Sequence, residues 1–308
     1  MKNIIISGSL AYDRIMAFAD KFSNHVLSEK IDNLSVCFQV DGITEKLGGT
    51  AGNIAYALKL MGGEPRLTAT IGSDYQRYFD WFKQREISTE GIVVIPEEYT
   101  AGAYITSDAN DNQITCFNPG AMKFSSGFDF DTLRSGDDLC LVSPGNLDDM
   151  INYPKECEKR KITCIFDPGQ ALPVLSGDDL VEVISKSSML VVNDYEFNLI
   201  LEKTSYSRNE LLKLAKTTII TLGDKGSDVY LNGTAHHVAP CQANRVVDPT
   251  GAGDAFRGGL LYGLLNEKDL LQSARLGSVC ASFAVECSGT QEYSFTEKQF
   301  QQRLATIK

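Results

Sequence analysis

The most informative stretch of the sequence is Asp248-Pro249-Thr250-Gly251-Ala252-Gly253-Asp254-Ala255-Phe256. It follows a predicted strand, Arg245-Val246-Val247, and opens a predicted helix over Gly253–Leu265. Gly251, Ala252 and Gly253 have almost no side chains, so their N–H groups at a helix N-terminus can approach an anion closely. Asp254 would then lie beside bound phosphate, where it could take a proton from an attacking hydroxyl. A tight turn with an acid in the first helical turn is the alternative, but acids on both sides of the glycines favour a functional site.

Short apolar runs alternate with helical patterns along most of the chain. The runs predict strands at Asn3–Ser7, Arg66–Ile71, Asp138–Ser143, Ile162–Asp167, Met189–Asn193 and Thr217–Leu222. Helices are predicted at Asn53–Met61, Tyr75–Arg85, Leu147–Lys159, Asp179–Ser187, Asn209–Lys216, Leu270–Glu286 and Thr296–Thr306. This alternation indicates an α/β fold with three layers, in which helices cover both faces of a mostly parallel sheet. Turn-forming residues collect at the carboxyl ends of the strands, the edge where such sheets bind ligands.

Two segments, residues 31–47 and 100–117, alternate with a period of two. The second contains the turn-forming stretch Asp108–Gln113 between two apolar runs. We interpret both segments as antiparallel strands inserted into the α/β chain, either as edge decoration of the main sheet or, as we favour, as a small β-sheet lid over the ligand edge. The prediction is one α/β domain over residues 1–308, with lid strands contributed by about 10–47 and 98–118.

Composition excludes several classes of protein. The 308 residues are 43% hydrophobic and carry a net charge of −11 without clustered Lys or Arg, which excludes a disordered chain and argues against a nucleic-acid partner. We find no signal-peptide core or membrane span, and therefore expect no membrane partner. The 8 cysteines form no Cys-x-x-Cys pair, and there are 3 histidines, so a disulfide scaffold or a His-built metal site is not expected. These features predict a reduced, cytoplasmic protein.

A second glycine-rich segment, Gly48-Gly49-Thr50-Ala51-Gly52-Asn53, precedes the helix ending near Met61. Asn53 could cap that helix, or it could direct its amide at a polyol, with the bare backbone of Gly48 and Gly49 making room. The segment also fits a Gly-x-Thr-x-Gly elbow, which leaves a hydrolase using Thr50 as a rival. The dinucleotide fingerprint, the P-loop and the protein-kinase signatures are all absent from the sequence.

Four segments, in this order and spacing, resemble the ribokinase-like (PfkB) family of sugar and nucleoside kinases. They are Gly48-Gly49…Asn53, Asn193-Asp194-Tyr195-Glu196, Thr221-Leu222-Gly223-Asp224-Lys225-Gly226 and Asp248–Asp254. The resemblance runs from Ser7 to about Tyr293. The opening Gly8-Ser9-Leu10-Ala11-Tyr12-Asp13 and the later Asp111-Asn112-Gln113-Ile114-Thr115 look most like the bacterial members known as adenosine kinases.

The resemblance implies roles on the acceptor side and at the reacting centre. Asp254 matches the family's catalytic base, and Gly251, Ala252 and Gly253 match its anion hole. Asp13, Gly49 and Asn53 match positions that hold sugar hydroxyls. In addition, Phe38 and Phe117 lie on predicted lid strands, where an aromatic ring could stack on a base. Considered alone, Asp13 could instead be a turn residue at the hinge of the lid.

The resemblance also implies a donor site for ATP. Asn193 and Glu196 match a motif linked to Mg²⁺ and phosphate, while Thr221, Gly223 and Gly226 match the nucleotide-binding strand and turn. Ser278 stands where several relatives carry Asn or His near the adenine. Asp248 and Thr250 match a K⁺ site, although Cys287 and Tyr293 replace residues common around it. By themselves, Asn193 and Glu196 fit a helix N-cap and a first-turn acid equally well.

The sequence therefore predicts an ATP-dependent kinase that phosphorylates the 5′-hydroxyl of a ribonucleoside, adenosine being the first choice. Mg²⁺ is the expected cofactor, and K⁺ a second candidate. The main alternative is a kinase for a free sugar such as ribose or fructose. A catalytically silent nucleoside or sugar sensor on the same fold is a further rival, which the retained Asp254 argues against. The expected partners are small molecules, and both a monomer and a homodimer remain open.

Overall fold

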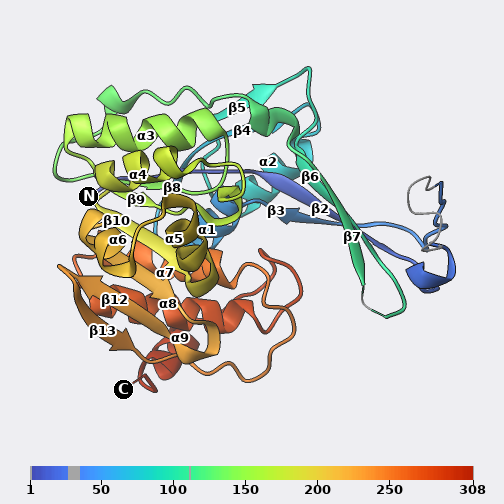
Figure 1. The fold of residues 1–308 in the computed structure, drawn as a ribbon. Coiled ribbons are helices and arrows are strands. Elements are labelled where there is room, and N and C mark those ends of the chain that lie inside the picture. The colour runs from blue at the N-terminus through green and yellow to red at the C-terminus, as the bar shows by residue number, and fades with distance from the viewer. Residues whose placement is uncertain (1, 27–34, 111, 308) are drawn as a thin grey trace.

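The computed structural model describes residues 2–26, 35–110 and 112–307 and has the predicted three-layer α/β architecture (Figure 1). Within these residues a nine-stranded sheet has the order β13-β12-β11-β10-β9-β8-β1-β4-β5. Its strands are β1 (Ile4–Ser7), β4 (Arg66–Gly72), β5 (Ile92–Ile95), β8 (Leu139–Val142), β9 (Thr163–Phe166), β10 (Met189–Asn193), β11 (Thr217–Thr221), β12 (Ser227–Leu231) and β13 (Thr234–Val238). In this spatial order, the neighbouring strands from β11 through β10, β9, β8, β1 and β4 to β5 are all parallel. At the other edge, β12 and β13 add antiparallel pairs.

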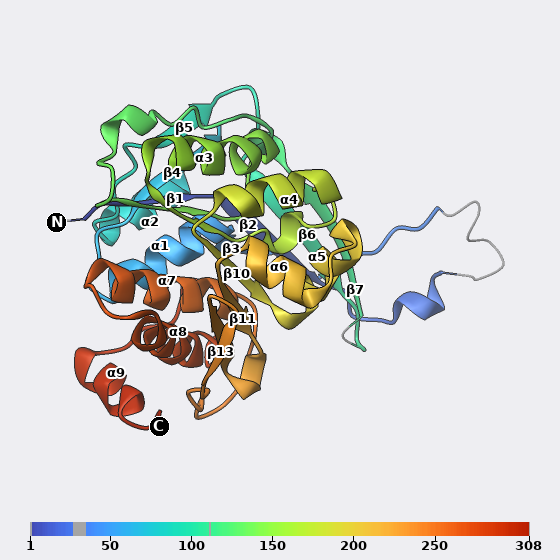
Figure 2. The same ribbon diagram turned by 60° about the vertical axis from the view of Figure 1, so that its left-hand side comes forward.

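Helices cover both faces of the large sheet, as Figure 2 shows. They are α1 (Thr50–Leu60), α2 (Gln76–Gln84), α3 (Leu147–Arg160), α4 (Gly177–Lys186), α5 (Asp194–Thr204), α6 (Arg208–Leu214), α7 (Ala252–Leu265), α8 (Leu270–Ala284) and α9 (Glu297–Leu304). Alternate strand residues face opposite layers: Ile4 and Ile6 pack in the core of α1, α2, α7 and α8, whereas Ile5 packs in that of α3 to α6. The predicted strands and helices of the core are confirmed to within about three residues at their ends.

A separate small sheet projects from the core and has the order β3-β2-β6-β7. Its strands are β2 (Ala11–Ala17), β3 (Thr44–Gly48), β6 (Ala101–Ser107) and β7 (Gln113–Asn118). The β6–β7 hairpin confirms the turn predicted after Ser107. The two pairs β2–β3 and β6–β7 are antiparallel, as predicted, but β2 and β6 join them in parallel.

Two expectations about secondary structure are wrong, and three elements of the structure have no counterpart in the prediction. Residues 245–247 form no strand: Val246 is 71% exposed, and apolar side chains alone do not provide a neighbouring strand to pair with. Of the strand predicted over 31–47, only Thr44–Gly48 is extended and paired; residues 35–43 are irregular, and 31–34 lie outside the described residues. Helix α5 and strands β5 and β12 were not predicted. Among the described residues, every helix is too short or too polar to span a bilayer.

Candidate active site

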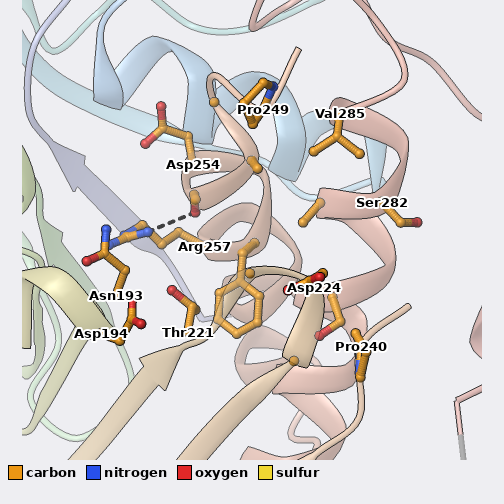
Figure 3. Close-up of a pocket in the computed structure, with 18 of the residues that line it drawn as sticks. Asn193, Asp194, Thr221, Asp224, Pro240, Pro249, Asp254, Arg257, Ser282 and Val285 are labelled. Carbon is orange, nitrogen blue, oxygen red and sulfur yellow. Dashed lines mark hydrogen bonds between the residues drawn. The ribbon is translucent and has the colours of Figure 1, made fainter. Parts of the chain in front are cut away.

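A cavity of about 680 Å³ opens at the carboxyl ends of β9, β10 and β11, between the N-termini of α5 and α7 (Figure 3). Segments far apart in the chain meet here, which confirms the sheet edge as the place where the polar motifs gather. The predicted site residues that line the cavity are Asn193, Glu196, Thr221, Gly223, Gly226, Gly251, Ala252, Gly253, Asp254 and Ser278. The walls also include apolar groups such as Val246, Pro249 and Val285.

The glycine turn begins α7 as the sequence predicts. Gly251 is the N-cap and has φ = +78°, a conformation that glycine adopts without strain. A side chain at this position would place its Cβ 2.7 Å from Thr290 Cγ2, so the site also lacks room for one. The first N–H groups of a helix have no partner within the helix. Gly251, Ala252 and Gly253 line the cavity, so free N–H groups of this turn can bind an anion there, although the N–H of Ala252 already donates to the Pro249 carbonyl over 3.2 Å.

Asp254 lies in the first turn of α7 and lines the cavity. Burial raises the pKa of Asp254 to about 6, and the charges of Glu196 and Asp13 add to the rise. A hydrogen bond from Asn53 and the charge of Arg257 oppose it. A carboxylate with a pKa slightly below neutral is ionised at pH 7 yet still accepts a proton readily, as a general base must.

Asn53 is not a helix cap, because α1 begins at Thr50 with Gly49 as its N-cap. Gly49 has φ = +88°, and a Cβ there would lie 2.6 Å from the Ser9 carbonyl oxygen. The side chain of Asn53 is instead buried in the site, where its Nδ2 donates to Asp254 Oδ2 over 2.8 Å. Its Oδ1 accepts hydrogen bonds from Thr290 and Gln291. Among the described residues the Nδ2 group donates to Asp254 alone, so its second hydrogen can still bind a polyol hydroxyl, as the sequence predicts.

Asp13 lies inside β2, opposite Lys46 of β3, and is therefore not a turn residue. Gly48 makes room for its carboxylate: a Cβ on Gly48 would lie 2.6 Å from Asp13 Oδ2. Burial raises the pKa of Asp13, as does the charge of Asp248, while Lys46 opposes the rise. The segment holding Asp13, Gly48, Gly49 and Asn53 lies next to the cavity and is joined to it by the bond from Asn53 to Asp254.

The structure does not place either predicted aromatic residue at the cavity. Phe117 lies on β7 and is 53% exposed. Phe38 is not on a strand; its ring packs against Phe18 and Phe22 at 4.9 Å between centroids. The hydrolase alternative also finds little support, because the Thr50 hydroxyl is buried and donates to the Pro144 carbonyl at 2.8 Å.

Asn193 and Glu196 form a reciprocal cap at the start of α5. Glu196 N donates to Asn193 Oδ1 over 2.7 Å, and Asn193 N donates to Glu196 Oε2 over 2.8 Å. The helix-cap interpretation is thus correct, and it is compatible with a site role because both residues also line the cavity. Mg²⁺ typically binds through one or two carboxylates while water and substrate phosphates supply the remaining oxygens. Glu196 fits this arrangement, because its Oε2 makes the cap and its Oε1 is left for a metal ion. The described residues contain no group of three or more His, Cys, Asp or Glu that could hold a metal ion without such help from water and substrate.

The two residues predicted for K⁺ lie just before the glycine turn and outside the cavity lining. Asp248 Oδ1 accepts a hydrogen bond from Thr250 N at 2.9 Å, which shapes the turn. Thr250 is exposed and Asp248 is half-buried. Their role as ligands stays a prediction.

Sequence reasoning missed a buried ion pair beneath the glycine turn. Arg257 Nη2 lies 2.7 Å from Asp167 Oδ1. Arg257 Nη1 donates to the Gly253 carbonyl over 3.0 Å, the bond drawn as a dashed line in Figure 3. Burial raises the pKa of Asp167, and the charge of Arg257 opposes the rise. The spacing of four residues between Gly253 and Arg257 puts both on one side of α7, and this signal could have identified Arg257.

Comparisons with known proteins agree with this geometry. Residues 12–298 match the model of the pfkB family carbohydrate kinases. The chain is 37% identical to the nucleoside kinase of Burkholderia thailandensis, whose structure in complex with inosine superposes with a TM-score of 0.86 over 98% of both chains. It is 29% identical to the nucleoside kinase of Methanocaldococcus jannaschii, covering 85% of this chain and 87% of the relative. It is also 27% identical to a fructokinase of Escherichia coli, covering 79% of this chain and 86% of the relative.

Proposed function

The chain belongs to the pfkB family of carbohydrate kinases, and we propose that it transfers the γ-phosphate of ATP to the 5′-hydroxyl of a ribonucleoside, adenosine being the best candidate. The observation that carries the proposal is the position of Asp254: it follows the glycine turn directly and is bonded to Asn53 of the acceptor-side segment. A base placed there lies between a donor phosphate and an acceptor hydroxyl. Phosphoryl transfer requires that the reacting groups are positioned and that the charge on the transferred phosphoryl group is stabilised. In this proposal the glycine turn and Asp254 together meet both requirements.

In this proposal the acceptor lies against Asp13, Gly48, Gly49 and Asn53, and Asp13 and Asn53 hold its ribose hydroxyls. Asp254 takes the proton of the 5′-hydroxyl as the oxygen attacks the γ-phosphorus. The N–H groups of Gly251, Ala252 and Gly253 stabilise the charge on the transferred group. The small sheet acts as a lid that excludes water from the reaction.

The donor occupies the part of the cavity lined by Asn193, Thr221, Gly223, Gly226 and Ser278. Glu196 would hold Mg²⁺, which supplies charge neutralisation to the donor phosphates. Asp248 and Thr250 form the proposed K⁺ site. We place the protein in the cytoplasm, where ATP and the reduced state of its eight free cysteines are expected.

Adenosine is favoured over a free sugar by two observations. The segments Gly8–Asp13 and Asp111–Thr115 resemble adenosine kinases, and the 37%-identical relative was solved with inosine, another purine ribonucleoside. The free-sugar alternative keeps support from the fructokinase relatives.

A panel of acceptors tests the proposal directly. ATP consumption would be measured with adenosine, inosine, guanosine, cytidine, ribose and fructose, with and without EDTA, and with Asp254→Asn as the inactive control. We expect turnover of adenosine or another ribonucleoside to exceed that of either sugar and to disappear with EDTA. Turnover of a free sugar without turnover of any nucleoside would contradict the proposal.

A further inference from the structure

Two donors determine which way the amide of Asn53 points. Its Oδ1 accepts from Thr290 Oγ1 at 2.8 Å and from Gln291 Nε2 at 3.0 Å. Thr290 Oγ1 also lies 3.1 Å from the Leu47 carbonyl oxygen, so the one hydroxyl proton of Thr290 is shared between two acceptors. With donors on the Oδ1 side, the Nδ2 group must face Asp254, to which it donates over 2.8 Å.

The amide of Gln291 is itself oriented by Trp81. Indole nitrogen is a donor only, so its partner must be an oxygen, and Trp81 Nε1 donates to Gln291 Oε1 over 3.0 Å. Gln291 Nε2 then faces Asn53 and the Tyr78 hydroxyl, 2.7 Å away. The Tyr78 proton goes to the Gly48 carbonyl over 2.7 Å, which leaves the hydroxyl oxygen free to accept. Both Nε2 hydrogens of Gln291 are therefore used, and its side chain is only 1% exposed.

We propose that Gln291 and Trp81 are positioning residues for phosphoryl transfer, which act through Asn53 so that an N–H group, not a carbonyl oxygen, faces Asp254. This inference rests on the proposed function, in which Asp254 is the base. The hydrogen bonds run in one direction, from the indole of Trp81 through Gln291 and Asn53 to the carboxylate. We call these four residues the relay.

Reversing the Asn53 amide would place its Oδ1 against a carboxylate oxygen. Two acceptors in contact repel, and the carboxyl of Asp254 would relieve the repulsion by holding a proton more tightly. The other charged groups around Asp254 are Arg257 on α7, Glu196 on α5, Asp13 on β2 and Asp167 after β9. None of them belongs to the relay, so a charge-neutral change in it, such as Trp81→Phe, tests the orientation of Asn53 with all of these charges unaltered.

The first test is Gln291→Glu, which keeps the shape of the side chain but adds a charge near Asp254, and the charge-neutral variant Trp81→Phe then separates orientation from charge. A carboxylate still accepts from Trp81 but has no hydrogen to donate, so Asn53 must turn its Nδ2 toward the new acid. We expect the pKa of Asp254 to rise by about one unit or more, and kcat/KM at pH 6 to fall about tenfold. KM for ATP should stay within about twofold, since the donor side is untouched. The pKa is read by ¹³C NMR titration of labelled carboxyl groups, with Asp254 assigned by the signal missing in Asp254→Asn.

The matched control is Gln84→Glu. Gln84 is exposed and lies with Trp81 along a second, outer cavity of about 560 Å³, so the same charge is added nearby without touching the relay. A second variant, Trp81→Phe, removes only the indole donor and keeps a ring beneath the Arg85 guanidinium, which lies 3.0 Å from the indole centroid. We expect Gln84→Glu to titrate like the wild type, and Trp81→Phe to shift the pKa of Asp254 upward by less than Gln291→Glu does.

If the Asp254 titration and the pH profile of Gln291→Glu coincide with those of Gln84→Glu, the proposal is overturned. If Gln291→Glu does not fold, Trp81→Phe decides, and an unchanged titration there overturns it equally. The titration needs no turnover, so it separates the two proposals. A wild-type protein without kinase activity would contradict the proposed function, whereas a shifted Asp254 titration in the charge-neutral Trp81→Phe would still support the relay as a device that orients Asn53.

Discussion

Arg257 and Asp167 pair at the wall of the cavity, with Nη2 of the arginine 2.7 Å from Oδ1 of an aspartate 90 positions earlier in the chain. Both side chains are nearly inaccessible, at 6% and 2% exposure. Because the same guanidinium bonds the Gly253 carbonyl, the pair ties the end of β9 to the first turn of α7. The glycine turn is thus fixed by a buried charge contact as well as by the helix that it begins.

Removing one partner of this pair should be costly. Arg257→Met leaves a buried carboxylate without its counter-charge, and we expect the free energy of unfolding to fall by about 3–5 kcal/mol. Replacing both, as in Asp167→Leu with Arg257→Met, should recover part of that loss, because no unpaired charge remains. Urea denaturation of the two single variants and the double variant measures the coupling. Strictly additive losses would show that the pair contributes no stabilising interaction.

Asp254→Asn tests the assignment of the base. The amide keeps the size of the side chain but cannot take a proton, so kcat should fall by about 10²–10⁴ while both substrates still bind. Calorimetric titration with nucleoside and with ATP separates binding from turnover. An acid that only favours the helix dipole would instead cost about 0.3–1 kcal/mol of stability with little change in turnover. Near wild-type kcat in a well-folded variant would refute the assignment.

The raised pKa of Asp254 also predicts how stability depends on pH. Because its folded pKa of about 6 lies above the ordinary value of 3.8, the native state binds this proton more tightly than the unfolded chain. Its contribution to stability is therefore present below pH 4 and is lost as the pH rises through 6. Asp254→Asn removes the titrating group, so its stability relative to the wild type should increase by about 1–3 kcal/mol between pH 4 and pH 7. Urea midpoints of the two proteins at several pH values measure this, and a constant difference would argue against the raised pKa.

The same carboxyl should control the acid side of the activity profile. A base must be deprotonated before it can accept the proton of the acceptor hydroxyl, so kcat/KM should fall about tenfold per pH unit below the pKa of Asp254, about 6. Initial rates between pH 4.5 and 8 with the best acceptor give the profile. An activity that stays level down to pH 5 would show that another group takes the proton.

Asp13→Ala should weaken acceptor binding without altering ATP binding. Losing a hydrogen bond to a charged group costs about 1.5–3 kcal/mol, which corresponds to roughly a tenfold to hundredfold change in affinity. Asp41→Ala is a suitable control, since it removes an exposed aspartate near the small sheet. Calorimetry with the acceptor found in the panel compares the variants. Equal acceptor affinities in Asp13→Ala and Asp41→Ala would assign Asp13 a structural role in β2.

The parts of the structure around the cavity that sequence predicts correctly carry a local signal. Gly251 and Gly253 predict a glycine turn that begins a helix, and the structure has this turn at the start of α7. The glycine-rich segment predicts Asn53 as a site residue but not its hydrogen-bond partners, because all three stand more than 200 positions away. The strand predicted around Val246 is wrong for the same reason. An apolar, β-branched side chain is a local property, whereas a strand also needs a pairing strand from elsewhere in the chain.

The parallel pairing of β2 with β6 determines the order in which the small sheet can be assembled. Ala11 lies opposite Ala101 and Ala17 opposite Ser107, and the connection between the two strands passes through β3, α1, β4, α2 and β5. A pairing so distant in sequence forms later than local contacts, because the long loop must be closed first. During synthesis, the strand carrying Asp13 therefore waits with one edge unpaired until β6 has left the ribosome. Over that interval the growing chain presents a strand to which another nascent chain can add, so the acceptor side is where misassembly of this protein is expected to begin.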